Sequence, residues 1–293
     1  MKLNEYFKWR NTISKENEIG IEVEMEGGYL PESVTGWQIK TDGSLRGNSF
    51  EYVFPAPTTR EKSQVLIERL YTAFNSPSYK IKPSDRCGVH IHVNYRHETL
   101  ETIFNAISLY FMLEDVLMHW CGEEREGNLF CLRAKDAEHI LYALIKDKQQ
   151  GGFDRVTSQN NFKYGALNLA ALQAYGSLEY RGLQTPKITK PILTYLDIVT
   201  KIKDWAKTHS ERETMDLFCH SGPLVFMRQV LGPTLARALR YEGWQRDMIE
   251  GVRRMQMLAY TPLHKMNTLD TASYSDTHED LRNAEEEEND YFR

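Results

Sequence analysis

The segment IGIEVEME, residues 19–26, alternates apolar residues with glycine and glutamate over its whole length. Successive side chains of a β-strand point to opposite faces, so this alternation predicts a strand with one apolar and one polar face. The polar face carries three carboxylates, those of Glu22, Glu24 and Glu26. A strand of this kind is buried on one side only, which is typical of antiparallel sheets.

Further strands are expected where the same period of two recurs. Residues 49–54 follow an Asp-Gly turn, residues 89–94 read VHIHVN, and residues 164–170 and 177–183 fit a short hairpin. Three of these strands bring charged or imidazole side chains to one face, namely Glu51, His90 with His92, and Glu179 with Arg181. The sequence therefore predicts a sheet whose polar face is rich in carboxylate, imidazole and guanidinium groups.

Helical patterns separate and follow these strands. The expected helices cover residues 58–74, 99–120, 136–148, 189–207, 211–220, 223–230 and 234–259. We expect the first helix to begin with a capping box of Thr58 and Glu61, and the Gly-rich segment 149–159 to be a loop. Because regular βαβ alternation is missing, the prediction is an α+β fold, an antiparallel β-sheet packed by helices with a helical C-terminal part.

Length and charge set the broad class. The 293 residues are 41% hydrophobic and 26% charged, which is typical of a globular protein. The formal net charge of −5 divides into −6 for residues 271–293 and +1 for the rest. We expect one domain over residues 1–270 and a disordered acidic tail over residues 271–293, and we do not expect nucleic acid as a partner.

The sequence also bears on location. No stretch reaches the ~20 apolar residues of a membrane span, and the first 20 residues lack the apolar core of a signal peptide. The four cysteines show no CxxC spacing. We therefore expect a cytoplasmic protein with free thiols and no membrane partner.

The polar face points to metal and phosphate chemistry when its members are taken together. One Glu-x-Glu, His-x-His or Glu-x-Arg pair alone is typical of a solvated strand. The four carboxylates of Glu22, Glu24, Glu51 and Glu179, however, do not all stay ionised on one face unless cations offset them, and two divalent ions would do so. Oxygen ligands with imidazole suit Mg²⁺ or Mn²⁺, and a neighbouring arginine suits phosphate. This predicts metal-assisted phosphoryl chemistry on a nucleotide, held without a Walker-type loop.

The ordered motifs resemble a known family. They are GIEVE at 20–24, DGSL at 42–45, EYVFP at 51–55, GVHIHVN at 88–94 and LEYRG at 178–182. In this order they are similar to the amidoligases, carboxylate–amine ligases of the glutamine synthetase and glutamate–cysteine ligase superfamily. The resemblance implies a glutamine synthetase-like catalytic fold with a curved sheet. It also implies that ATP phosphorylates a carboxylate and that an amine then displaces phosphate.

The resemblance also implies roles for individual residues. Glu24 and Glu51 would bind one divalent ion, and Glu22, His90 and Glu179 would bind another that bridges the ATP phosphates. Glu51, Glu179 and Arg181 would be catalytic, with Arg181 stabilising the transferring phosphoryl group. His92 would contact phosphate or nucleotide. The substrates would be small-molecule or peptide carboxylates and amines, and a homo-oligomer is an option because related enzymes share active sites between subunits.

Several alternatives stay open at this point. Asn168 is either a nucleotide or substrate contact or a buried structural residue, and Asp42 is either a ligand or a turn residue. Glu114 and Arg133 are each either near the site or structural, and segment 149–159 is either a closing lid or an ordinary loop. The competing functions are a cupin-like enzyme that binds one metal through His90 and His92, and a non-catalytic relative that acts as a binding protein.

Overall fold

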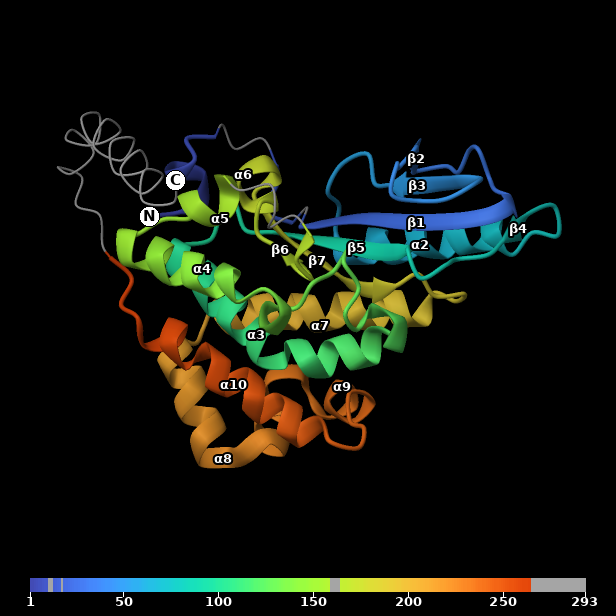
Figure 1. The fold of residues 1–293 in the computed structure, drawn as a ribbon. Coiled ribbons are helices and arrows are strands. Elements are labelled where there is room, and N and C mark those ends of the chain that lie inside the picture. Colours follow the sequence, from blue (N-terminus) through green and yellow to red (C-terminus); the bar gives the residue numbers. More distant parts are fainter. Residues whose placement is uncertain (10–12, 17, 159–163, 265–293) are drawn as a thin grey trace, which may run out of the picture.

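An antiparallel sheet of seven strands forms one layer of the molecule. The computed structural model describes residues 1–9, 13–16, 18–158 and 164–264. The strands are β1 (Ile19–Tyr29), β2 (Gln38–Lys40), β3 (Ser49–Val53), β4 (Lys80–Ile81), β5 (Gly88–Asn94), β6 (Leu167–Asn168) and β7 (Ser177–Gln184). Their order is β2-β3-β1-β5-β7-β6, with β4 paired to β1, and every pairing is antiparallel. The predicted antiparallel sheet is confirmed, with β1 near its middle (Figure 1).

Helices pack beneath this sheet, as the predicted fold class requires. The α-helices are α1 (Leu3–Tyr6), α2 (Arg60–Phe74), α3 (Leu100–Cys121), α4 (Glu138–Gln150), α5 (Asp154–Ser158), α6 (Ala171–Tyr175), α7 (Lys190–Ala206), α8 (Glu211–Leu231), α9 (Pro233–Ala238) and α10 (Trp244–Tyr260). Two 3₁₀ turns, η1 (Glu123–Arg125) and η2 (Ala134–Asp136), follow α3. Figure 1 shows α3 and α7 running under the sheet, with α8 and α10 in a further layer below.

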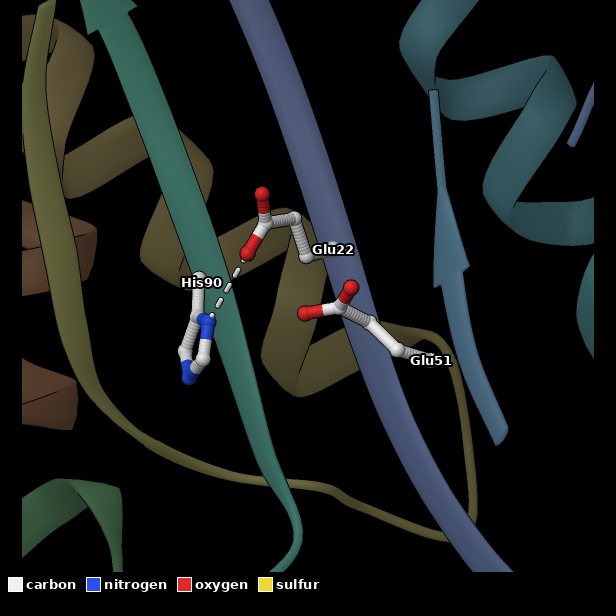
Figure 2. A group of neighbouring side chains, drawn as sticks. All are labelled: Glu22, Glu51 and His90. Atoms are coloured by element: carbon white, nitrogen blue, oxygen red, sulfur yellow. Dashed lines mark hydrogen bonds and ion pairs between the residues drawn. The ribbon is translucent and has the colours of Figure 1, made fainter. Parts of the chain in front are cut away.

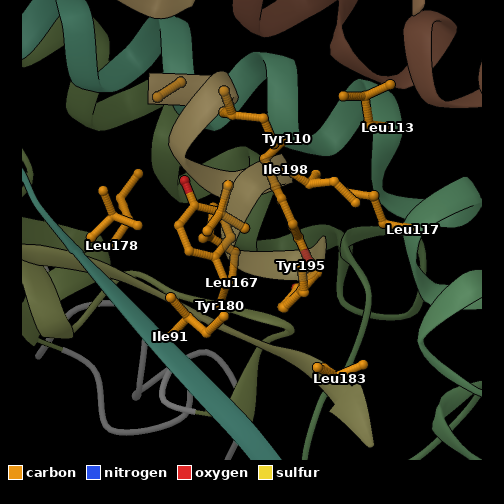
Figure 3. Close-up of a cluster of buried hydrophobic side chains, with 14 of the residues drawn as sticks. Ile91, Tyr110, Leu113, Leu117, Leu167, Leu178, Tyr180, Leu183, Tyr195 and Ile198 are labelled. Carbon is orange, nitrogen blue, oxygen red and sulfur yellow. The ribbon is translucent and has the colours of Figure 1, made fainter. Parts of the chain in front are cut away.

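The buried core explains which sheet face remains for chemistry. Ile19, Ile21, Val23 and Met25 of β1 are at most 1% exposed. In Figure 3 residues of β5 and β7 meet side chains of α3 and α7, and the Tyr180 and Tyr110 rings lie 5.3 Å apart. Each large apolar side chain buried there contributes about 1.5–3 kcal/mol. Burial of one face therefore turns every alternate side chain of β1 to the other face.

The first long helix begins one residue later than predicted. Thr59, not Thr58, is its N-cap, and its side chain accepts a hydrogen bond from the Lys62 backbone N–H. The Thr58 backbone is engaged elsewhere, because its N–H and C=O both pair with Ile19 of β1. Val65, which lies between the buried positions of this helix, is 53% exposed.

Other departures from the predicted elements occur at glycines and at one short helix. Residues 154–158 of the expected loop form α5, whose first backbone N–H groups donate to the Asp147 carboxylate. The expected helix 234–259 is divided into α9 and α10, and α10 starts after Gly243, which has φ +93°. Residue 159 and the predicted tail 271–293 lie outside the described residues. Among the residues described, no helix is long and apolar enough to cross a membrane.

Candidate active site

The strand register brings the predicted side chains together on the free sheet face. The directly opposed pairs are Glu24 with Glu51 across β1 and β3, Glu22 with His90 across β1 and β5, and His92 with Glu179 across β5 and β7. Opposed residues of an antiparallel pair have their Cβ atoms about 4.5–5.5 Å apart. In Figure 2 Glu22, Glu51 and His90 turn toward one another from three neighbouring strands. The predicted set is therefore one contiguous cluster.

His90 lies at the centre of the carboxylates. Its Nδ1 is 3.0 Å from Glu22 Oε2 and 3.6 Å from Glu179 Oε1. Its Nε2 is 3.8 Å from Glu24 Oε1. The ring is only 3% exposed, so these three carboxylates form its immediate environment. An imidazole between carboxylates on both sides is suited to share a cation with them.

His92 has one nitrogen fixed and one available. Its Nδ1 lies 3.0 Å from Ser177 Oγ. Its Nε2 is buried and lies 3.4 Å from Glu22 Oε1 and 3.9 Å from Glu179 Oε2, yet it forms no hydrogen bond with any group in the described residues. Histidines that bind metals commonly use the second ring nitrogen in a hydrogen bond that orients the ring. This arrangement fits a metal ligand at His92 Nε2.

Glu179 is held from both sides. Asn168 Nδ2 donates to Oε2 at 2.6 Å, and Arg181 Nη1 donates to Oε1 at 2.7 Å. Burial would raise the pKa of this carboxyl, but the charges of His92 and Arg181 outweigh burial and lower it. Glu179 is thus an ionised, oriented carboxylate, and Asn168 is its buried hydrogen-bond partner.

Three groups of possible metal ligands follow from these positions. In each group the ligand atoms lie within 4.8 Å of one another, and the groups are Glu22–His92–Glu179, Glu22–Glu51–His90 and Glu24–Asp42–Glu51. The first and the last share no residue, so two cations could be held side by side. Asp42 Oδ1 also accepts the Ser44 N–H at 2.7 Å, so this residue is both a turn residue and within ligand reach. The family resemblance implied that His90 would bind an ion together with Glu22 and Glu179. In the structure the ligand group that contains both of these glutamates has His92 as its third member.

Burial and neighbouring charges shift the pKa values of the carboxylates in the cluster. Burial, and then repulsion from Glu22, Asp42 and Glu24, raises the pKa of Glu51 to about 8. Burial also raises the pKa of Glu24, against the charge of His90. For Glu22 burial acts in the same direction, but the His90 and His92 rings outweigh it and lower its pKa. The carboxylates are therefore not all charged together in the free protein, and bound cations would allow them to be.

Sequence patterns did not reveal Arg125, which lies next to the cluster. The side chain is 1% exposed, and its guanidinium donates to the backbone oxygens of Arg181 at 2.8 Å and Gly182 at 3.2 Å. A Cβ added to Gly88 would lie 3.1 Å from Arg125 Nη2 and 3.3 Å from both Glu24 Oε2 and His90 Nε2. Gly88 thus leaves the space in which these groups meet, and the glycine in GVHIHVN was the available signal.

Glu114 and Arg133 make their contacts outside the cluster. Glu114 is fully buried on α3 and accepts the Ala134 N–H at 2.7 Å. Arg133 forms ion pairs with Asp136 at 2.8 Å and with Glu126 at 3.4 Å. Both residues therefore hold the segment after α3 in place.

One face of the sheet is thus packed against helices, and the other carries carboxylates, two imidazoles and an arginine. The sequence model of one protein family, described as "putative amidoligase enzyme", matches residues 34–195. This is more than half of the chain, so the chain belongs to this amidoligase family, and membership supports a ligase. No curated protein matches the chain. The match includes Glu51, His90, His92, Glu179 and Arg181 but begins after β1, which carries Glu22 and Glu24.

Proposed function

We propose that the protein is an ATP-dependent carboxylate–amine ligase that works through an acyl phosphate, within the glutamine synthetase and glutamate–cysteine ligase superfamily. The observation that carries the proposal is the pair of separate ligand groups, Glu22–His92–Glu179 and Glu24–Asp42–Glu51, on one sheet face. Carboxylate oxygens with a single imidazole suit Mg²⁺ or Mn²⁺. Such ions, when bound, would offset the charges of the carboxylates and of a triphosphate.

In this reaction Arg181 would act on the transferring phosphoryl group. Arg181 donates through Nη1 to Glu179 and through Nε to the Phe130 carbonyl oxygen, and its Nη2 group is suited to the charge that grows on a transferring phosphoryl group. Transfer of the γ-phosphoryl group to a substrate carboxylate would give ADP and an acyl phosphate. Attack of an amine on the acyl carbon would then form the amide, with loss of phosphate from carbon and of a proton from nitrogen.

The single-metal alternative fits this cluster less well. His90 and His92 fall in different ligand groups, each with two carboxylates, rather than in one group that contains both rings. The sheet is also a single open one, with β2 and β6 as the ends of its strand order, whereas a cupin is a jelly roll of two packed sheets. These two observations favour the two-ion ligase.

ADP release with Mg²⁺ or Mn²⁺, measured against panels of amino acids, polyamines and peptides, tests the proposal. By mass spectrometry we expect a product whose mass equals the sum of the two substrate masses minus that of water. Glu179→Gln is expected to abolish ADP release while the variant remains folded by circular dichroism. Glu26→Gln is the matched control, because Glu26 lies on the same face of β1 but outside the ligand groups. Wild-type ADP release by Glu179→Gln would contradict the proposal.

A further inference from the structure

A cavity continues the active-site face beyond Glu22. It has a volume of about 240 Å³, and it is lined by Glu22 and His92 of the cluster, by Gly20 of β1 and by Tyr175 at the end of α6. Its other wall is the turn 54–57 after β3. The cavity therefore shares two residues with the ligand group Glu22–His92–Glu179.

Gly20 makes room for this cavity. Gly20 and His92 are directly opposed in the sheet, and a Cβ added to Gly20 would lie 3.3 Å from the Cβ of His92. Residues 24, 22 and 20 of β1 face the same side, at a spacing of roughly 6.6 Å for each two residues. Along β1 the face thus carries the Glu24 ligand group, then the Glu22 ligand group and then the cavity. A nucleotide that lies along the strand with its triphosphate at the Glu22 group would place its base at the cavity.

The walls of the cavity suit a flat, uncharged ring. Residues 54–57 supply phenylalanine, alanine and two prolines, and the Tyr175 ring, 61% exposed, meets His92 edge-on at 5.6 Å. Gln38 adds an amide that can both donate and accept hydrogen bonds. Lys40 is outnumbered by the lining acids Glu18 and Glu22, so the lining gives no excess of positive charge for phosphate.

The size of the cavity indicates that it takes part of a ligand. Whole small-molecule sites measure roughly 300–1,000 Å³, and 240 Å³ is smaller. We propose that this cavity binds the purine base of the nucleotide, stacked on Tyr175 and recognised along its edge by Gln38, while the triphosphate lies at the Glu22–His92–Glu179 group. The inference rests on the proposed function and adds to it the site that selects the nucleoside.

Comparison of Mg·ATP with Mg·tripolyphosphate isolates the contribution of the base. In the wild-type protein Mg·ATP is expected to bind more tightly than Mg·tripolyphosphate by isothermal titration. Tyr175→Ala is expected to weaken Mg·ATP binding about tenfold, as loss of one base–aromatic stack does, and to leave Mg·tripolyphosphate binding unchanged. Ala56→Trp, which fills the cavity from the opposite wall, is expected to act in the same way. Tyr142→Ala is the control, since Tyr142 on α4 is 64% exposed and is not part of this lining.

The outcomes separate this inference from the proposed function. If the ratio of the two affinities is the same in wild type and in Ala56→Trp, the base does not lie in this cavity and the inference is wrong. If Tyr175→Ala weakens the binding of both ligands equally, the substitution has disturbed the neighbouring His92. The ratio of affinities in Ala56→Trp then decides whether the base lies in the cavity. If the wild-type protein binds neither ligand with Mg²⁺, the proposed function itself is wrong, and the inference falls with it.

Discussion

Replacement of Glu114 by glutamine should remove a large part of the pH dependence of stability. Burial raises the pKa of Glu114 to about 8 from an ordinary value of 4.5, against the hydrogen bond from the Ala134 N–H. The folded state then holds the proton more tightly than the unfolded chain. Its contribution to stability is full below pH 4.5 and is lost as the pH rises to 8. The total is about 5 kcal/mol, or about 1.4 kcal/mol per pH unit.

Urea unfolding at pH 5.5 and 7.5 measures this effect. The free energy of unfolding of the wild-type protein should fall over these two units by about 3 kcal/mol more than that of Glu114→Gln. Glutamine is neutral and can still accept the Ala134 N–H, so the variant should fold and should retain ADP release. Glu250→Gln, at an exposed glutamate, should leave the slope unchanged. Parallel curves for wild type and Glu114→Gln would refute the reasoning.

Other predictions concern the cluster itself. Ser177→Ala removes the partner of His92 Nδ1 and should lower Mn²⁺ affinity about 10- to 100-fold in a titration, whereas unchanged affinity would mean that the ring needs no such support. Gly88→Ala should displace Arg125, should lower the free energy of unfolding by about 1–3 kcal/mol and should abolish ADP release. Gly28→Ala, where an added Cβ makes only ordinary contacts, should lower the free energy of unfolding by less. Chelation should abolish ADP release and lower the melting temperature, and added Mg²⁺ or Mn²⁺ should restore both; activity that survives chelation would contradict a metal site.

The side of the sheet on which each residue lies was predictable from the sequence. Side chains alternate strictly along a strand, so the apolar residues of β1 determine where Glu22 and Glu24 point. The neighbours across the sheet were not predictable in the same way. Opposition of His92 to Glu179 joins residues 87 positions apart, and that pairing depends on the packing of the whole sheet.

The parts that sequence patterns missed depend on tertiary contacts. Arg125 occupies no periodic position, and its role comes from backbone oxygens of β7 that only the fold brings near it. The N-cap of α2 is Thr59 rather than Thr58 because a bridge to β1 takes up the Thr58 backbone. Residues 154–158 became helical because Asp147, on α4, caps them. In each case a partner distant or unrecognised in the sequence determined the local structure.

The position of β1 has a practical consequence for anyone who shortens this chain. A fragment cut to the residues of the family match, 34–195, would lack the strand between β3 and β5. The sheet would fall into two unjoined halves, each with a bare edge of unpaired N–H and C=O groups that invites aggregation. Each half would also keep only some of the ligands, because Glu22 and Glu24 belong to the missing strand. The boundaries of the recognisable family segment are therefore not the boundaries of the smallest working enzyme.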